Sequence, residues 1–139
     1  MTISYKLFGI PRTFDEFVDK VKKKNGEKRL DVILRLNMIP DLSPKLGSRK
    51  TTLRYKTYVG VRAGRTRLTI SKNNYPFSRD FDVYNRQRYE FSQKATTEAI
   101  ETAEKLQNFG LEATINKMSV DEIKEASRKL GEAYHEEFG

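Results

Sequence analysis

A strict alternation of side-chain character between positions 53 and 71 constrains the fold more than any other feature. The apolar set of alternate positions holds Leu53, Tyr55, Thr57, Val59 and Val61, and the other set holds Arg54, Lys56, Tyr58, Gly60 and Arg62. After a turn predicted at Ala63-Gly64, the two sets continue as Thr66, Leu68 and Ile70 against Arg65, Arg67, Thr69 and Ser71. Because successive side chains of a strand point to opposite faces, this pattern predicts a β-hairpin with one buried and one basic face.

The position of the turn also predicts how the two strands pair. With the turn at Ala63-Gly64, Val59 is expected opposite Leu68 on the buried face, and Arg62 opposite Arg65 on the exposed face. Like charges directly opposed on neighbouring strands destabilise a sheet by roughly 0.2–1 kcal/mol per pair. Since the fold gains nothing from this arrangement, an anionic partner is expected to face the hairpin.

The exposed face of the hairpin is the predicted nucleic-acid-binding site. Its residues are Arg54, Lys56, Tyr58, Arg62, Arg65 and Arg67. Four of the five cations are arginine, whose planar guanidinium binds phosphate through two hydrogen bonds and stacks on bases. Tyr58 is the candidate for stacking on a base of a single strand. The alternative interpretation is a solvated face whose cations only discourage edge-to-edge aggregation.

Helices and further strands are expected on both sides of the hairpin. Before it, residues 3–8 predict a strand, and Thr13 with Glu16 forms a capping box for a short amphipathic helix. Residues 30–36 predict a further strand, which a Pro- and Ser-containing loop follows over 37–50.

After the hairpin, the apolar spacing predicts a long helix from about Phe91 to Gly110, then a strand over 111–116. Ser119 and Glu122 open a last helix. This order predicts an α+β fold: a single antiparallel or mixed sheet with a central basic hairpin and about three helices packed on one face.

Length and charge indicate one domain with two electrostatic halves. The 139 residues suffice for a single core. Residues 1–94, the basic strand-rich part, carry 22 Lys and Arg against 9 Asp and Glu, whereas residues 95–139, the acidic helical part, carry 5 against 10. This asymmetry points to a polyanionic partner. The chain has no Cys and no long apolar stretch, so a cytoplasmic protein without a membrane segment or export signal is expected.

Other basic residues are predicted as secondary phosphate contacts. They are Lys22, Lys23, Lys24, Arg49, Lys50, Arg79, Arg86 and Arg88. The three lysines are equally explained by the dipole at the end of the first helix, which favours cations. The last three arginines alternate with the aromatic residues of segment 75–91, and those aromatic residues are expected mainly in the core.

Catalysis is not expected, and neither a metal nor a cofactor is predicted. The single His, His135, and the absence of Cys exclude a His-based metal cluster and a Ser-His or Cys-His nucleophile pair. Asp80 and Asp82, spaced like carboxylates on one face of a strand, could hold Mg²⁺ with Glu90, but this spacing is common. No glycine-rich phosphate loop is present.

The sequence therefore favours a small non-enzymatic nucleic-acid-binding protein that contacts DNA or RNA phosphates through the basic hairpin. The alternative is a protein-binding inhibitor or accessory factor from a phage or other mobile element, whose basic face meets an acidic surface on its target. Recognition of a small anionic ligand is a third hypothesis. The acidic helices either solvate the protein or contact a basic partner, including a second copy in a homo-oligomer.

Overall fold

The computed structural model describes residues 13–23, 29–40 and 53–138. The strand predicted over 3–8 and positions 41–50 of the predicted loop lie outside these residues. The loop prediction for positions 37–40 is wrong, because they belong to a strand. Four described strands form one mixed sheet in the order β3-β2-β1-β4. The strands are β1 (Arg29–Pro40), β2 (Leu53–Ala63), β3 (Thr66–Phe77) and β4 (Glu112–Ile115). β2 runs antiparallel to β1 and β3, and β4 runs parallel to β1.

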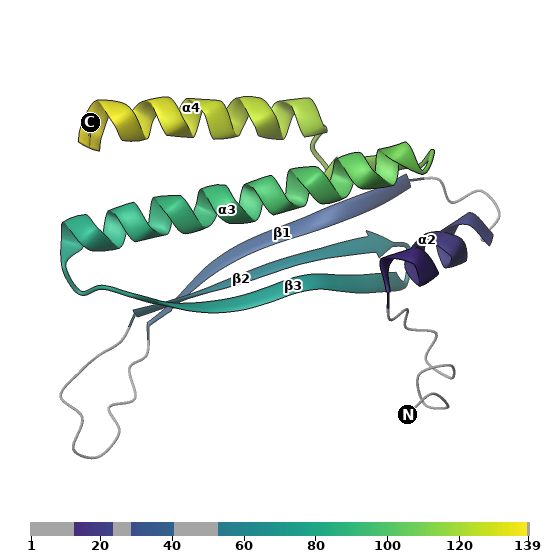
Figure 1. Cartoon of the computed structure of the whole chain (residues 1–139), viewed down its shortest axis with the longest axis horizontal. Coiled ribbons are helices and arrows are strands. Elements are labelled where there is room, and N and C mark those ends of the chain that lie inside the picture. Colours follow the sequence, from purple (N-terminus) through teal and green to yellow (C-terminus); the bar gives the residue numbers. More distant parts are fainter. Residues whose placement is uncertain (1–12, 24–28, 41–52, 139) are drawn as a thin grey trace, which may run out of the picture.

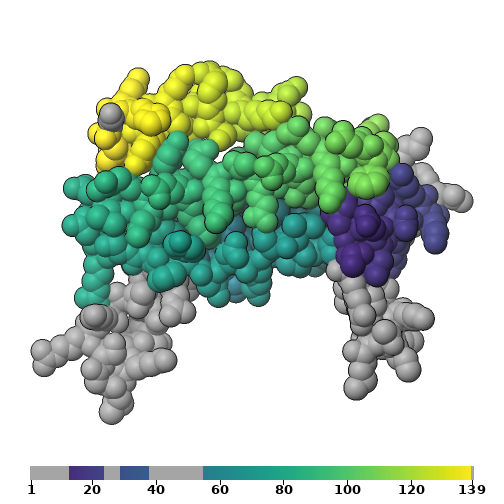
Figure 2. Space-filling view, viewed as in Figure 1, coloured from purple at the N-terminus to yellow at the C-terminus, as the bar shows by residue number. Residues whose placement is uncertain are grey.

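The helices lie on one side of this sheet (Figure 1). They are α2 (Phe14–Lys23), α3 (Phe81–Asn108) and α4 (Val120–Phe138). α2 and α3 contact the strands, whereas α4 lies on the outer side of α3 and reaches the sheet only at β4. The space-filling view shows the same succession of layers (Figure 2). The predicted α+β class is confirmed, and no described helix covers the other side of the sheet, which we call the open face.

The core fills the space between the sheet and α2 and α3. Val32 of β1, Val59 of β2 and Phe17 of α2 are fully buried there. Ala95, Ala99 and Ala103 of α3 are also buried, at intervals of four residues. Because alanine is small, this face of α3 can approach the strands closely. The inner side chains of β2 are those that the alternation predicted to be buried.

A second, aromatic cluster joins the far end of the hairpin to the first half of α3. Tyr55, Phe77, Tyr84 and Phe91 form it. The rings of Tyr55 and Phe77 meet edge to face, with 4.9 Å between their centroids. Burial raises the pKa of the Tyr55 phenol, and the nearby Arg88 guanidinium opposes this rise. The interpretation of segment 75–91 as core is thus confirmed for these rings, whereas Tyr75 and Phe81 are exposed.

The predicted turn of the hairpin is wrong by one residue, and the predicted pairing of its strands is therefore wrong by two residues. Ala63 pairs with Thr66, so the two central residues of the turn are Gly64 and Arg65 rather than Ala63 and Gly64. Gly64 has a φ of 59°, a conformation that glycine adopts without strain and that two-residue hairpin turns require. As a result Arg62 lies opposite Arg67, and Arg65 lies in the turn. A shift of two residues keeps the side chains near the turn on their predicted faces.

A β-bulge then breaks the alternation in β3. Gly60 pairs with Thr69, but its neighbour Val59 pairs with Ser71, so Ile70 is an extra residue. Beyond the bulge the parity of β3 is reversed, and Ser71 faces inward with Val59 instead of outward as predicted. The reversal has a packing reason: it turns Phe77 inward, into the aromatic cluster.

The capping residues explain where the helices begin. The Thr13 hydroxyl accepts from the Glu16 amide at 3.1 Å, and the Ser119 hydroxyl accepts from the Glu122 amide at 3.1 Å, as predicted. α3 begins earlier than expected, because the Asp80 carboxylate accepts from the amides of Asp82 and Val83 at 3.0 and 3.1 Å. Asp80 and Asp82 are therefore a helix cap and a first-turn residue. They do not form the pair of strand carboxylates that their spacing also allowed.

Candidate nucleic-acid interface

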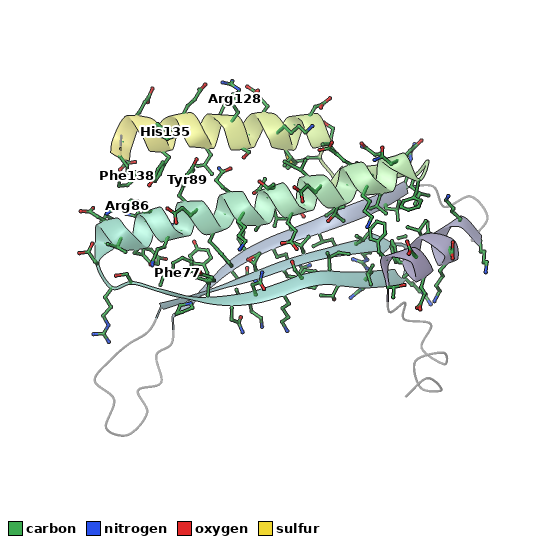
Figure 3. The ribbon with its side chains drawn as sticks, in the orientation of Figure 1. Phe77, Arg86, Tyr89, Arg128, His135 and Phe138 are labelled. Carbon is green, nitrogen blue, oxygen red and sulfur yellow. The ribbon has the colours of Figure 1, made fainter. Side chains whose placement is uncertain are left out.

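The outward-pointing residues of three strands form cross-strand rows on the open face. From β1 through β2 to β3 these rows are Asn37, Lys56 and Asn74; Arg35, Tyr58 and Lys72; Ile33, Gly60 and Thr69; and Asp31, Arg62 and Arg67. Nitrogen-tipped side chains project from this side of the sheet, away from the helices (Figure 3). The register therefore concentrates cations from β1, β2 and β3 on a single surface.

A hollow of about 470 Å³ lies at the centre of these rows. Its lining residues are Ile33, Arg35, Asn37, Lys56, Tyr58, Arg62, Arg67 and Lys72. Five of these eight residues are cations, so the hollow is strongly electropositive. Its size falls within the range of sites that bind small molecules and single chemical groups.

The Tyr58 ring forms the floor of this hollow, and Gly60 lies beneath the ring. A Cβ atom at Gly60 would lie 2.5 Å from the Tyr58 Oη and 2.7 Å from its Cζ, closer than real Cβ atoms approach. The Tyr58 ring therefore lies over Gly60, against the backbone of its own strand. Because glycine has no side chain, it makes the room that this ring position needs. The ring is half-buried, and cations stand beside it on both neighbouring strands.

The cations of the hollow are not neutralised by the described part of the chain. Within it, Arg35, Lys56, Arg62, Arg67 and Lys72 form no ion pair with a carboxylate, whereas ion pairs such as Arg29–Glu112 and Lys124–Glu104 lie elsewhere. Arg62 instead donates from Nε to the Gly64 carbonyl at 3.3 Å.

Asp31, which lies opposite Arg62 in the register, is engaged on its other side. Its Oδ1 accepts from the Thr114 hydroxyl at 3.0 Å and from the Lys117 amide at 2.9 Å. These hydrogen bonds hold the carboxylate toward β4 and the turn after it. Asp31 thus reduces the positive potential at one rim of the hollow without forming an ion pair with Arg62.

The structure brings together four of the six residues predicted for the site. Lys56, Tyr58, Arg62 and Arg67 all line the hollow. Arg65 is exposed in the turn at the end of the hairpin and does not line it. For Arg54, only the backbone is described: it pairs with Ile39 and Pro76 near the other end of β2.

None of the predicted secondary contacts that are described lines the hollow. Lys22 and Lys23 end α2 on the helix side, and the Lys22 Nζ lies 5.5 Å from the centre of the Phe109 ring. Arg88 of α3 lies over the Tyr55 ring at 5.7 Å, and Arg86 belongs to the same helix (Figure 3). Arg79 lies in the connection between β3 and α3. Lys24, Arg49 and Lys50 fall outside the described residues.

Two cations of the hollow, Arg35 and Lys72, were absent from the predicted site. The signal for Arg35 is present in the sequence, because Leu34 and Leu36 on either side are apolar and Arg35 alternates with them. Lys72 reaches the open face only because the bulge at Ile70 reverses the parity of β3. A strict alternation also places residue 72 on the inner face, so the sequence pattern alone conceals it.

Metal binding, membrane insertion and homology give no further lead on function. Among the described residues, no three His, Asp or Glu side chains gather where they could hold a metal ion. None of the helices in the described part is both long and apolar enough to cross a membrane. No protein-family model, curated protein or solved structure matches this chain.

Proposed function

We propose that this protein binds nucleic acid without catalysing a reaction, and that it contacts phosphates through the open face of its sheet. The observation that carries the proposal is the hollow with five cations, contributed by three strands and free of ion pairs within the described residues. A nucleic acid supplies closely spaced phosphates, and each phosphate neutralised by Lys or Arg releases counterions, which favours binding. The lack of Cys suits action in a reducing cytoplasm.

The pairing of like charges supports this proposal. Arg62 and Arg67 lie directly opposite each other on β2 and β3, an arrangement that costs the free protein stability. An anion bound between them converts the repulsion into two charge-assisted hydrogen-bonding contacts. Stability alone would favour a neutral or acidic residue at one of these positions.

The distribution of acidic residues supports it as well. Glu98, Glu101 and Glu104 belong to α3, and most acidic residues after position 115 belong to α4, so both groups lie on the helix side of the sheet. The field of the protein therefore directs an approaching polyanion to the open face and away from the helices.

A salt titration of two double variants, each lacking two cations, tests the proposal. The variant Arg62→Ala/Arg67→Ala removes two cations from the hollow, and the control Lys94→Ala/Lys129→Ala removes two exposed cations from α3 and α4. Binding of a labelled oligonucleotide is measured by fluorescence anisotropy at several salt concentrations. We expect the first variant to bind more weakly and to lower the slope of log K against log salt by up to about 2, because two phosphate contacts are lost.

The control variant should keep the slope of the unaltered protein, since it carries the same net charge as the test variant but an intact open face. Equal slopes for the test variant and the unaltered protein would contradict the proposed interface. If no oligonucleotide binds at micromolar concentration, nucleic acid is not the partner, and an acidic protein surface becomes the leading hypothesis.

A further inference from the structure

The shape of the open face bears on the kind of nucleic acid that fits it. A duplex is convex and its bases are paired, so proteins that read it insert a helix or a β-ribbon into one of its grooves. The open face instead presents a hollow of about 470 Å³ that is lined by Tyr58 and Ile33 as well as by cations. The paired bases of a duplex cannot enter it. An unpaired strand can turn one base into the hollow.

The chemistry of the floor matches a base better than a phosphate. The Tyr58 ring and the Ile33 side chain offer apolar surface to a bound base. Bases stack on aromatic rings whatever their identity, because each has a π-face. Asn37, also in the lining, carries an amide that can donate to and accept from a base edge.

The cations stand where the flanking phosphates of such a base would be. Tyr58 has Arg35 beside it on β1 and Lys72 beside it on β3. Neighbouring strands are about 4.8 Å apart, so the Cα atoms of these two cations are separated by about 10 Å across the ring. Their long side chains can reach the backbone on both sides of a base that lies on Tyr58.

From this arrangement we infer that the hollow takes an unpaired base of single-stranded nucleic acid, stacked on Tyr58, while Arg35 and Lys72 hold the adjoining phosphates. The inference rests on the proposed function and narrows it to single strands. It assigns to Tyr58 a role that no phosphate-binding surface requires. Binding should therefore depend on the bases of the ligand as well as on its charge.

Three labelled probes of about 12 nucleotides separate these contributions: an oligothymidylate, the same backbone with every base removed, and a duplex. We expect the protein to bind the oligothymidylate at least about 10-fold more tightly than the abasic strand. Tyr58→Ala should weaken binding of the oligothymidylate about 5- to 100-fold, the range for the loss of one stacked base, and leave the abasic strand unaffected.

Two further variants distinguish stacking from a loss of fold. Tyr58→Phe keeps the ring and should retain affinity within about threefold, because stacking needs the π-face and not the hydroxyl. Phe81→Ala removes an aromatic residue that is 75% exposed at the start of α3 and should leave the affinity for the oligothymidylate unchanged. Circular dichroism melting of each variant confirms that the comparison is made between folded proteins.

The binding of the three probes distinguishes a failure of the single-strand inference from a failure of the proposed nucleic-acid binding. Equal binding of the duplex, the abasic strand and the oligothymidylate, or an oligothymidylate affinity unchanged by Tyr58→Ala, overturns the single-strand inference and leaves phosphate binding in place. If none of the three probes binds, the proposed function itself is wrong.

Discussion

Among single residues, Gly60 is the one on which the position of the Tyr58 ring depends. A glycine inside a strand costs conformational entropy and adds no packing, so its presence at the centre of β2 calls for a local reason. The reason is the Tyr58 ring, which occupies the space of the missing side chain. Only glycine allows this ring to lie on the floor of the hollow instead of standing out from the sheet.

Replacing Gly60 by alanine tests this dependence without touching Tyr58 or any cation. The added methyl group would lie 2.5–2.9 Å from three atoms of the tyrosine, so the ring must rotate off the floor. We expect Gly60→Ala to weaken oligothymidylate binding at least about fivefold, approaching the effect of Tyr58→Ala, while the salt slope stays unchanged. The same anisotropy titration measures both quantities. An unchanged affinity would show that the position of the ring does not matter.

At the scale of elements, the bulge in β3 reconciles two packing demands. The first half of β3 buries Thr66 and Leu68 at even positions, whereas the aromatic cluster requires Phe77, at an odd position, to be buried as well. One extra residue, Ile70, switches the parity between them. The same switch turns Lys72 outward, so the packing of the aromatic cluster also adds a cation to the hollow.

Helix α4 is the most weakly held of the described elements. Among the described residues of α4, only Val120 is buried. Farther along, the Tyr134 ring stacks on Tyr89 of α3 with 3.8 Å between centroids, and Ser127 donates to Gln93 at 2.7 Å. Arg128 pairs with Glu125 and Glu132 along the helix and lowers the pKa of the Glu125 carboxyl through a hydrogen bond. The ion pairs of Arg128 lie within α4, so they stabilise the helix itself but do not attach it to α3.

Removing the stacked ring should therefore loosen α4 and leave the sheet intact. We expect Tyr134→Ala to lower the free energy of opening the second half of α4 by about 1 kcal/mol, the usual worth of an aromatic pair. Hydrogen exchange should show α4 amides exchanging about fivefold faster, with the amides of β1 and β2 unaltered and oligonucleotide binding unchanged. Faster exchange throughout the sheet would show that α4 is part of the global cooperative unit.

The sequence predicts most elements of this fold, because their signals are local. Capping by Thr13 and Ser119 and the alternation in β2 depend on neighbouring residues only. The alternation also suffices to place Lys56, Tyr58 and Arg62 on one face. The alternation does not predict the outward position of Lys72, because the bulge is imposed by packing against α3. The start of α3 is also not predicted, because the spacing of Asp80 and Asp82 resembles that of strand residues and does not reveal that Asp80 caps the helix.

At the scale of the whole molecule, the layers separate the charges. α3 and the sheet stand between the acidic surface of α4 and the cations of the open face (Figure 1). The net charge of +8 is therefore unevenly distributed: the electrostatic potential is more positive on the open face than on the helix side. Binding of an anionic polymer should thus be confined to one side of the sheet, and the helices should remain free of it.

NMR can show whether a bound oligonucleotide lies on the open face or on the helix side of the sheet, which is the central prediction of the proposed function. The ¹⁵N-labelled protein is titrated with the single-stranded oligothymidylate, and the amide signals and the arginine Nε–H signals are followed. We expect the largest shifts at Arg35, Tyr58, Arg62, Arg67 and Lys72, and no shifts of the α4 signals. Shifts concentrated on α3 and α4, with the open face unchanged, would contradict this prediction.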